Sequence, residues 1–211
     1  MARLLPLFPL QLVVFPGSAV PLHIFEERYR EMVGAAEAAG TEFGIVLARD
    51  NGIMNAGCTV LVESVVKRYP DGRFDVMTRG QRRFVIRSLN QDRDYLQGDV
   101  EFYSDEDPEA PPPELRQAAI QASQKMHEAL TEGEGGAQPA PNPDHPFLSF
   151  QLADSVDDLD FRNMLQRSRS EVERLRVFTG FTEEYVAKKL YTAKMKRLAP
   201  SNGFGHLPSI H

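Results

Sequence analysis

The chain has 211 residues, of which 42% are hydrophobic and 26% charged, and it carries a formal net charge of -6. These proportions are typical of soluble proteins, and a chain of this length buries about 70% of its unfolded surface without needing a disulfide or a metal. The acidic balance argues against a phosphate-binding protein, and the single cysteine, Cys58, excludes an internal disulfide and a Cys-rich zinc site. We therefore expect a cytoplasmic protein.

The apolar N-terminal segment, residues 4–15, predicts strands rather than a targeting signal or a membrane span. A secretory signal needs an uninterrupted apolar stretch, and about twelve residues are too few to cross a bilayer as a helix. The interruptions are Pro6, Pro9 and Gln11. We predict two strands, residues 4–8 and 12–15, separated by Pro9 and closed by a turn at Pro16-Gly17.

A helix and further strands follow. Five apolar residues recur at helical spacing before Gly40, which ends the predicted helix: Phe25, Tyr29, Met32, Val33 and Ala36. Asp71-Gly72 predicts a hairpin turn, and Gly80 is expected to break the returning strand. The predicted strands are residues 43–48, 59–67, 74–78, 84–86 and 95–103. Together they indicate a small, partly closed barrel.

The composition changes after Ser104. Residues 105–113 are rich in acidic residues and proline, which predicts a stiff solvated linker, with a metal or basic-partner site as the alternative. The pattern then becomes helical. We predict helices over residues 115–130, 147–153 and 159–165, another from Ser170 to Gly180 with a Ser170/Glu173 capping box, and a last one capped by Thr182. A mobile loop is expected at residues 133–143, and the tail from Pro200 is expected to be disordered.

These patterns predict an α+β protein in four parts. They are a barrel with one early helix (residues 1–104), the linker (residues 105–113), a helical bundle (residues 114–199) and the tail (residues 200–211).

The sequence contains no motif that predicts catalysis, a metal site or a cofactor. The closest approach to a triad is Asp144, His145 and Ser149, but three residues of one short segment rarely reach each other in the required geometry. Loop packing and helix capping explain them better. Cys58 is expected to be a small core residue rather than a reactive thiol, and His23 a structural or surface residue rather than a ligand.

Several N-terminal motifs occur in one order at close spacing. They are Leu5-Pro6-Leu7-Phe8-Pro9-Leu10, Val14-Phe15-Pro16-Gly17, Pro21-Leu22-His23-Ile24-Phe25-Glu26 and Arg28-Tyr29-x-x-Met32, followed later by Gly57-Cys58-Thr59-Val60 and Arg79-Gly80-Gln81-Arg82-Arg83-Phe84. This order resembles the N-terminal domain of Lon proteases. The resemblance covers residues 3–198, and it is more specific in the barrel than in the helices, where Leu152-Ala153-Asp154 and Glu173-Arg174-Leu175 carry it.

The resemblance implies a PUA-like barrel with a helical extension that recognises other proteins or unfolded polypeptides and takes part in oligomer formation. We expect a stand-alone domain, because the chain stops before the ATPase and Ser-Lys protease modules of Lon. The backbone-shaping motif residues are expected to be structural: Pro6, Pro9, Pro16, Gly17 and Gly80. The charged motif residues are Glu26, Arg28, Arg82 and Arg83. For them, a stabilising pair of Glu26 with Arg82 or Arg83 is weighed against ligand contact.

The candidate peptide-binding residues are Phe25, Tyr29, Met32 and Arg79, since Met and aromatic side chains adapt to varied partners. Burial of this helix face in the core is the alternative. The leading hypothesis is a non-enzymatic protein-binding module, with a homo-oligomer allowed. RNA binding through Arg79, Arg82, Arg83, Arg87 and the basic last helix is the second hypothesis, disfavoured by the acidic balance. A hydrolase using Asp144, His145 or Cys58 is the third.

Overall fold

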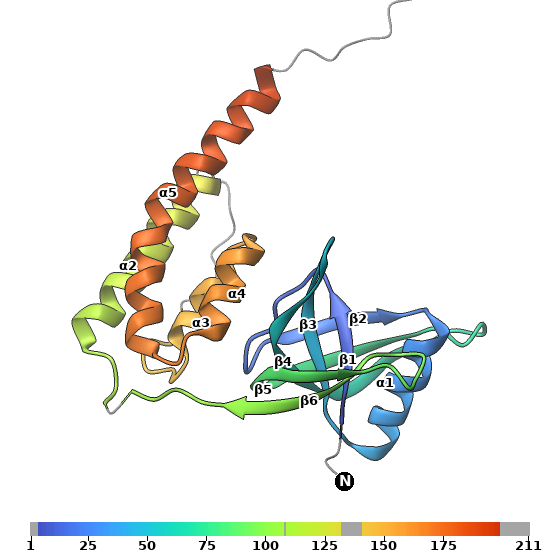
Figure 1. Cartoon of the computed structure of the whole chain (residues 1–211). Helices are drawn as coiled ribbons and strands as arrows, with labels where there is room; N and C mark the ends of the chain where they lie inside the picture. Colours follow the sequence, from blue (N-terminus) through green and yellow to red (C-terminus); the bar gives the residue numbers. More distant parts are fainter. Residues whose placement is uncertain (1–3, 108, 132–140, 199–211) are drawn as a thin grey trace, which may run out of the picture.

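The computed structural model describes residues 4–107, 109–131 and 141–198, and it places a β-rich unit before a group of helices (Figure 1). Most of the predicted loop at residues 133–143, and the tail from Pro200, lie outside the described residues. The combination of an N-terminal sheet and C-terminal helices confirms the predicted α+β class.

Six strands form one sheet with the order β2-β5-β4-β3-β1-β6, and a further pairing of β5 with β6 closes it into a barrel. The strands are β1 (Leu5–Leu10), β2 (Ala19–Ile24), β3 (Phe43–Arg49), β4 (Gly52–Arg68), β5 (Phe74–Asn90) and β6 (Gln97–Tyr103). Strand β5 serves two neighbours on one edge, because its first part pairs with β2 and its second part with β6. Strand β2 is therefore at the end of the sheet.

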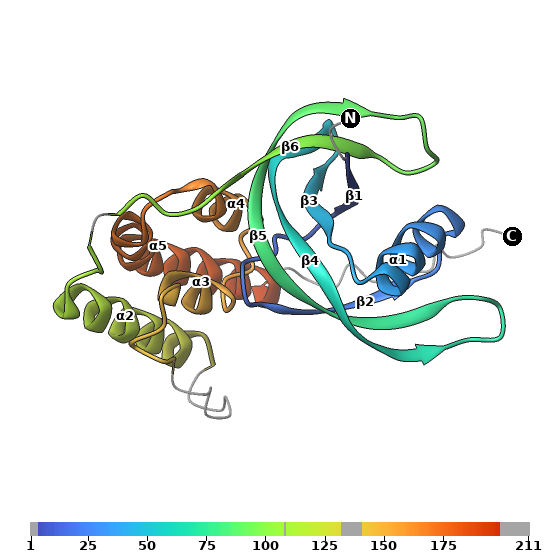
Figure 2. The ribbon, with the colours of Figure 1, turned by 90° about the horizontal axis from the view of Figure 1, so that it is seen from below.

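Helix α1 (Glu27–Ala39) lies within the curve of the sheet (Figure 2). Its apolar face, which includes Tyr29, Met32 and Val33, is buried in the barrel core. Gly40 ends the helix in the left-handed conformation with φ of 58°, which confirms the predicted end.

Pro9 does not separate two strands as predicted, because β1 runs through it to Leu10. On one side β1 pairs with β3 along Leu7–Leu10, whereas β6 pairs with its first residues, Leu5 and Pro6. A proline whose nitrogen faces an edge without a partner strand removes no ladder hydrogen bond. The strand can therefore include Pro9.

The predicted strand at residues 12–15 is instead a buried extended segment without ladder pairing. Two of its carbonyl groups accept hydrogen bonds from side chains of the helical unit. Arg162 donates to the carbonyl oxygen of Val13 at 3.0 Å, and Gln166 donates to that of Val14 at 2.7 Å. Buried backbone groups need hydrogen-bond partners, and here the helices supply them.

Gly80 does not break β5 as predicted, since the strand continues to Asn90. The residue permits a close approach of two backbones. A Cβ atom at Gly80 would lie 2.0 Å from the carbonyl oxygen of Phe15. Reciprocal hydrogen bonds also join Gly80 to Gly17 and Ser18, at 2.9 Å each, so the glycine fastens the turn to the strand.

The helical unit contains α2 (Pro113–Thr131), α3 (Leu148–Ala153), α4 (Leu159–Arg167) and α5 (Glu171–Leu198). The predicted start of α5 is confirmed, because the Ser170 hydroxyl oxygen accepts from the Glu173 amide at 3.0 Å. The predicted break between Gly180 and Thr182 is wrong, since α5 is a single helix of 28 residues. Phe178 and Tyr185 are buried on the two sides of this point, and their packing outweighs the roughly 1 kcal/mol that a helical glycine costs.

A few residues of the barrel unit belong to the apolar core of the helices. Phe15 from the segment after β1 stacks on Phe150 of α3 at a centroid distance of 4.6 Å. Both rings have 1% or less of their surface exposed. Leu47 of β3 belongs to the same cluster as the helical residues, whereas α1 and most of the strands bury their apolar residues in a separate barrel core, so the two units meet at an apolar interface.

The acidic segment after β6 was expected to be a solvated linker. In the structure, two of its carboxylates instead make specific hydrogen bonds. Asp105 accepts hydrogen bonds from Arg83 of β5 at 2.5 Å and from Arg174 of α5 at 2.7 and 2.5 Å. Asp107 accepts from the Ser170 hydroxyl at 2.7 Å and from the Glu171 amide at the start of α5. These two carboxylates therefore join the barrel to the bundle.

Candidate functional site

A groove of about 460 Å³ lies between β1, β2 and the start of α1. The three elements meet here because β1 and β2 are not paired with each other and α1 follows β2 after two residues. The groove is lined by Phe8, Pro9, Leu10, Pro21, Leu22, His23, Phe25, Glu26, Arg28, Tyr29 and Leu96. Apolar and aromatic side chains with a few charged groups are typical of a binding groove.

The floor of the groove is aromatic. The rings of Phe8 and Tyr29 lie 4.1 Å apart between centroids, and the Arg28 guanidinium lies 4.6 Å from the centre of the Tyr29 ring. Burial raises the pKa of Tyr29, and the charge of Arg28 opposes this only in part. The phenol therefore stays neutral, and the floor is aromatic and uncharged, with Phe8 and Tyr29 each 6% exposed.

Phe25 forms the exposed wall of the groove, with 58% of its surface accessible. Its ring stacks against His23 at 5.9 Å between centroids, and His23 is oriented by a hydrogen bond with Asp75. Asp75 also accepts from the Tyr69 hydroxyl at 2.8 Å. The bond with His23, followed by that from Tyr69, lowers the pKa of the Asp75 carboxyl, so this support stays ionised at neutral pH.

The rim carries one ion pair. Arg28 donates to Glu26 from two nitrogens at 3.0 and 2.7 Å, and this hydrogen bond raises the pKa of Arg28. The expected pairing of Glu26 with Arg82 or Arg83 is therefore wrong. Arg82 pairs with Glu42 at 3.0 Å, and Arg83 pairs with Asp105. Glu26 pairs with Arg28 because Arg28 lies only two residues further along the chain, on the same side of the groove.

The predicted binding residues separate into two groups. Phe25 and Tyr29 both line the groove. Met32 is 2% exposed and belongs to the barrel core. This agrees with the alternative expectation, which was burial of this helix face in the core. Arg79 lies opposite Ala19, at the other end of β2 from the groove, where it pairs with Glu63 and donates to the Gly17 carbonyl at 3.0 Å.

The residues weighed for catalysis do not come together. The Ser149 hydroxyl donates to Glu171 at 2.6 Å, whereas the His145 Nδ1 atom accepts from the Phe147 amide at 3.1 Å. Cys58 is completely buried, and that burial raises the pKa of its thiol to about 12. Within residues 4–107, 109–131 and 141–198, no group of three or more His, Cys, Asp or Glu side chains is arranged to hold a metal ion.

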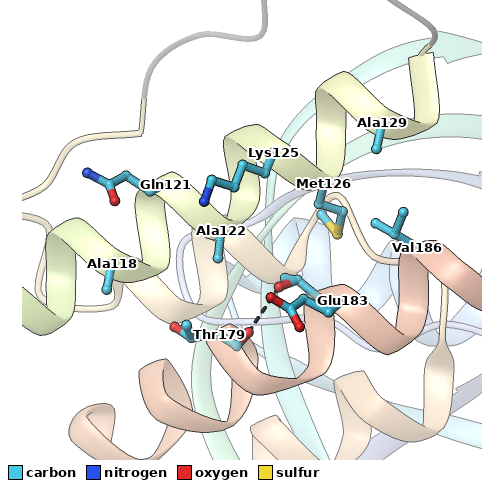
Figure 3. A pocket seen from close by; sticks show the side chains of 10 residues that line it. Ala118, Gln121, Ala122, Lys125, Met126, Ala129, Thr179, Glu183 and Val186 are labelled. Atoms are coloured by element: carbon cyan, nitrogen blue, oxygen red, sulfur yellow. Dashed lines mark hydrogen bonds between the residues drawn. The ribbon is translucent and has the colours of Figure 1, made fainter.

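Two other hollows are larger but differ in character. One, of about 820 Å³, contains Phe102, but the Arg82 guanidinium already stacks on that ring at 3.9 Å. The other, of about 510 Å³, lies between α2 and α5 and is lined mainly by small and mixed side chains (Figure 3). Among these three hollows, the β1–β2–α1 groove has the more exposed aromatic side chain, Phe25 at 58% against Phe102 at 40%, together with an aromatic floor.

The sequence missed the contributions of Pro21, His23 and Leu96 to the groove. Alternation of buried and exposed residues in β2 is visible in the sequence, where Val20, Leu22 and Ile24 are the buried set. That alternation places Pro21 and His23 on the outer face, which was the available signal. Leu96 is brought in by the chain closure before β6, and no local pattern indicates it.

A closed sheet with an inserted helix, followed by helices that pack against it, defines a mixed α+β domain. The chain belongs to the family of the ATP-dependent protease La (LON) substrate-binding domain, whose family model matches residues 4–177. This confirms the resemblance that the N-terminal motifs carry.

Curated relatives include Lon proteases that are much longer than the matched segment. The chain is 27% identical to the Lon protease of Flavobacterium johnsoniae over 115 residues, which is 50% of this chain and 14% of that protein. It is 25% identical to the Lon protease of Porphyromonas gingivalis over 101 residues, which is 44% of this chain and 12% of that protein.

Solved structures confirm the fold. A crystal structure of a Lon N-terminal domain protein from Xanthomonas campestris matches with a TM-score of 0.66 at 24% identity, covering 84% of this chain and 98% of that one. The N-terminal domain of a Mycobacterium avium complex Lon protease matches with a TM-score of 0.60 at 18% identity, covering 86% and 98% respectively.

Proposed function

We propose that this protein binds other polypeptides through the β1–β2–α1 groove, without catalysing a reaction on them. The observation that supports this most directly is Phe25, which is 58% exposed above the aromatic floor in a chain of a substrate-binding family. Large apolar side chains that stay exposed beside a groove commonly mark interaction sites. The expected occupant is an unfolded or extended segment that offers apolar side chains.

The groove suits recognition without strict sequence selection. The side chains that reach it from β1, β2 and α1 are mostly apolar, and the Glu26–Arg28 pair at the rim satisfies its own charges. Pro9 and Pro21 offer no backbone donors to an added strand. Contact is therefore expected to be made by side chains, with Phe25 as the anchor.

RNA binding gains no support from the arginines that suggested it. Arg79 pairs with Glu63, Arg82 with Glu42, and Arg87 with Glu101, while Arg83 is buried against Asp105. Phosphate binding needs free cationic groups that can release counterions. These carboxylates neutralise the cluster locally.

An adaptor role in protein quality control follows from the same proposal, since a domain that holds unfolded segments can present them to a separate machine. Helix α5 leaves apolar side chains exposed in its C-terminal half, which supports the expected self-association.

No helix among the described residues is long and apolar enough to cross a membrane. A cytoplasmic location is supported by the free thiol of Cys58.

The test measures binding of fluorescein-labelled casein, an unstructured polypeptide, by fluorescence anisotropy. Phe25→Ala should weaken binding by about tenfold, because removal of an aromatic anchor costs on the order of 1–2 kcal/mol. Because the Phe25 side chain is exposed, the Phe25→Ala variant should keep the melting temperature of the wild-type protein.

Two matched variants locate the effect. Val66→Ala removes another side chain that is 64% exposed in the barrel, and Phe102→Ala tests the hollow beside Arg82. Both should leave casein binding unchanged. Equal losses for all three variants, or no binding by the folded wild-type protein, would contradict the proposal.

A further inference from the structure

Helix α5 continues beyond the rest of the helical unit, and its projecting part has an exposed apolar surface. Figure 1 shows α5 extending past the ends of α2 and α4. Leu190, Tyr191 and Met195 in this part are 45%, 66% and 48% exposed. A soluble helix usually buries such residues against a partner.

One stripe of this surface has charged ends and an apolar centre. Glu183, Ala187, Leu190 and Lys194 are spaced by four, three and four residues, so they lie on one face of the helix, and all four are exposed. The acid and the base are separated by about 16 Å along the axis. Lys188 and Lys189 lie elsewhere, since they pair with Asp158 and Asp157.

We propose that a second copy of this chain packs its α5 antiparallel against this stripe, forming a two-fold symmetric dimer. The axis that places Glu183 of one copy opposite Lys194 of the other also places Ala187 opposite Leu190. The same axis brings Val186 opposite Tyr191. A small residue facing a large one allows close helix packing, and both charged ends meet opposite charges.

The parallel arrangement lacks this match. It would place Glu183 against Glu183 and Lys194 against Lys194, and like charges at close range repel. The stripe is therefore self-complementary in the antiparallel orientation, which closes a two-copy assembly.

The hollow between α2 and α5 extends the proposed interface. Ala118, Ala122 and Ala129 of α2 border it together with Thr182 and Val186 of α5, and its volume is about 510 Å³ (Figure 3). The proposed axis brings Met195 of the second copy opposite Thr182. The projecting end of one α5 thus lies over the hollow of the other copy, where the alanines leave room for an apolar side chain.

Sedimentation velocity of the full chain at increasing concentration tests the dimer. The wild-type protein should form dimers, and Leu190→Asp should dissociate them. Glu183→Lys and Lys194→Glu should each weaken the dimer by about tenfold, because each change replaces two attractive pairs by two repulsive ones.

Restoring complementarity should restore the dimer. A mixture of the Glu183→Lys and Lys194→Glu chains, and the variant carrying both changes, should regain wild-type affinity. Glu31→Lys on α1 reverses an exposed charge in the barrel and should have no effect. Circular dichroism and melting temperature establish that every variant is folded.

A monomeric wild-type protein would overturn the proposal. Dimers that single charge reversals leave unchanged would do the same, because they would show a different face or orientation. A chain that stays monomeric while Glu183→Lys weakens casein binding would assign the stripe to a client instead. Casein binding through Phe25 has a separate readout, so its failure is distinguishable.

Discussion

Arg174 has no exposed surface, yet its charge is fully matched. Its guanidinium donates to Asp105, to Glu171 at 2.6 Å, to the Ser149 hydroxyl at 2.9 Å and to the Ser168 carbonyl at 3.0 Å. The Glu173-Arg174-Leu175 motif is visible in the sequence, but two of the partners of Arg174, Asp105 and Ser149, are far away along the chain. Sequence reasoning therefore found the residue and missed its role, because a buried ion network depends on the tertiary fold.

Asp105 gives this network a pH dependence. Burial opposes ionisation of its carboxyl, but the hydrogen bond and charge of Arg174 and the charge of Arg83 outweigh it, so the pKa is lowered below the ordinary 3.8. A carboxyl with a lower pKa in the folded state binds fewer protons there than in the unfolded state. Its stabilising effect is present above about pH 4 and is lost as the pH falls through its folded pKa.

Asp105→Asn should lower the free energy of unfolding by about 3 kcal/mol at neutral pH, because two buried arginines lose their shared carboxylate. The difference from the wild-type protein should shrink at an acidic pH below the folded pKa of Asp105, which itself lies below 3.8, because the native carboxyl is then protonated. Urea unfolding at both pH values measures this. Glu106→Gln, which changes a 65% exposed carboxylate, is the control, and an equal effect of the two changes would contradict the network's role.

At the scale of elements, the sequence predicts well where local periodicity decides. Helix α1 with its Gly40 end, the Asp71-Gly72 turn and the start of α5 at Ser170 were all predicted. The errors fall at Pro9, Gly80 and Gly180, residues usually taken as breakers. In each case tertiary packing outweighs the cost of continuing the element, or an edge position avoids that cost, and the local sequence does not contain this information.

Gly180→Ala should stabilise the protein by about 0.5–1 kcal/mol, since no atom lies within 4 Å of the Cβ position and alanine favours a helix interior. Gly40→Ala should instead destabilise it by about 1 kcal/mol, because Gly40 has a left-handed φ of 58°. Chemical denaturation measures both. Destabilisation by Gly180→Ala would mean that the helix ends there after all.

For the molecule as a whole, the contacts between the barrel and the helices are relevant to the predicted division into two units. The Phe15–Phe150 stack, the Asp105 contacts and the bonds from Arg162 and Gln166 to the segment after β1 all cross that boundary. The boundary at residue 104 stays a prediction. These contacts lead us to expect that the two units unfold together.

Phe150→Ala should test this expectation. Loss of a ring with 1% exposure should cost about 3–5 kcal/mol. Hydrogen exchange followed by mass spectrometry should show amides of β5 and α5 losing protection to the same extent. If the β5 amides keep wild-type protection while the α5 amides lose theirs, the barrel is an independent unit.

The groove was only partly predictable. Phe25 and Tyr29 were selected from the sequence and line it, but exposure separates them, since Phe25 faces solvent and Tyr29 is 6% exposed. The pairing of β2 with β5, which fixes the position of the groove, is a long-range contact. Local sequence patterns therefore suggest the side chains and cannot assemble the site.

The most direct test of polypeptide binding at the groove places a photoreactive phenylalanine analogue at position 25 and, in a second chain, at position 66. Each folded variant is irradiated with casein, and the crosslinked peptides are identified by mass spectrometry. The proposal predicts strong crosslinking of casein from position 25 and background levels from position 66. Background levels from position 25, or equal yields from both, would show that polypeptides do not bind at this groove.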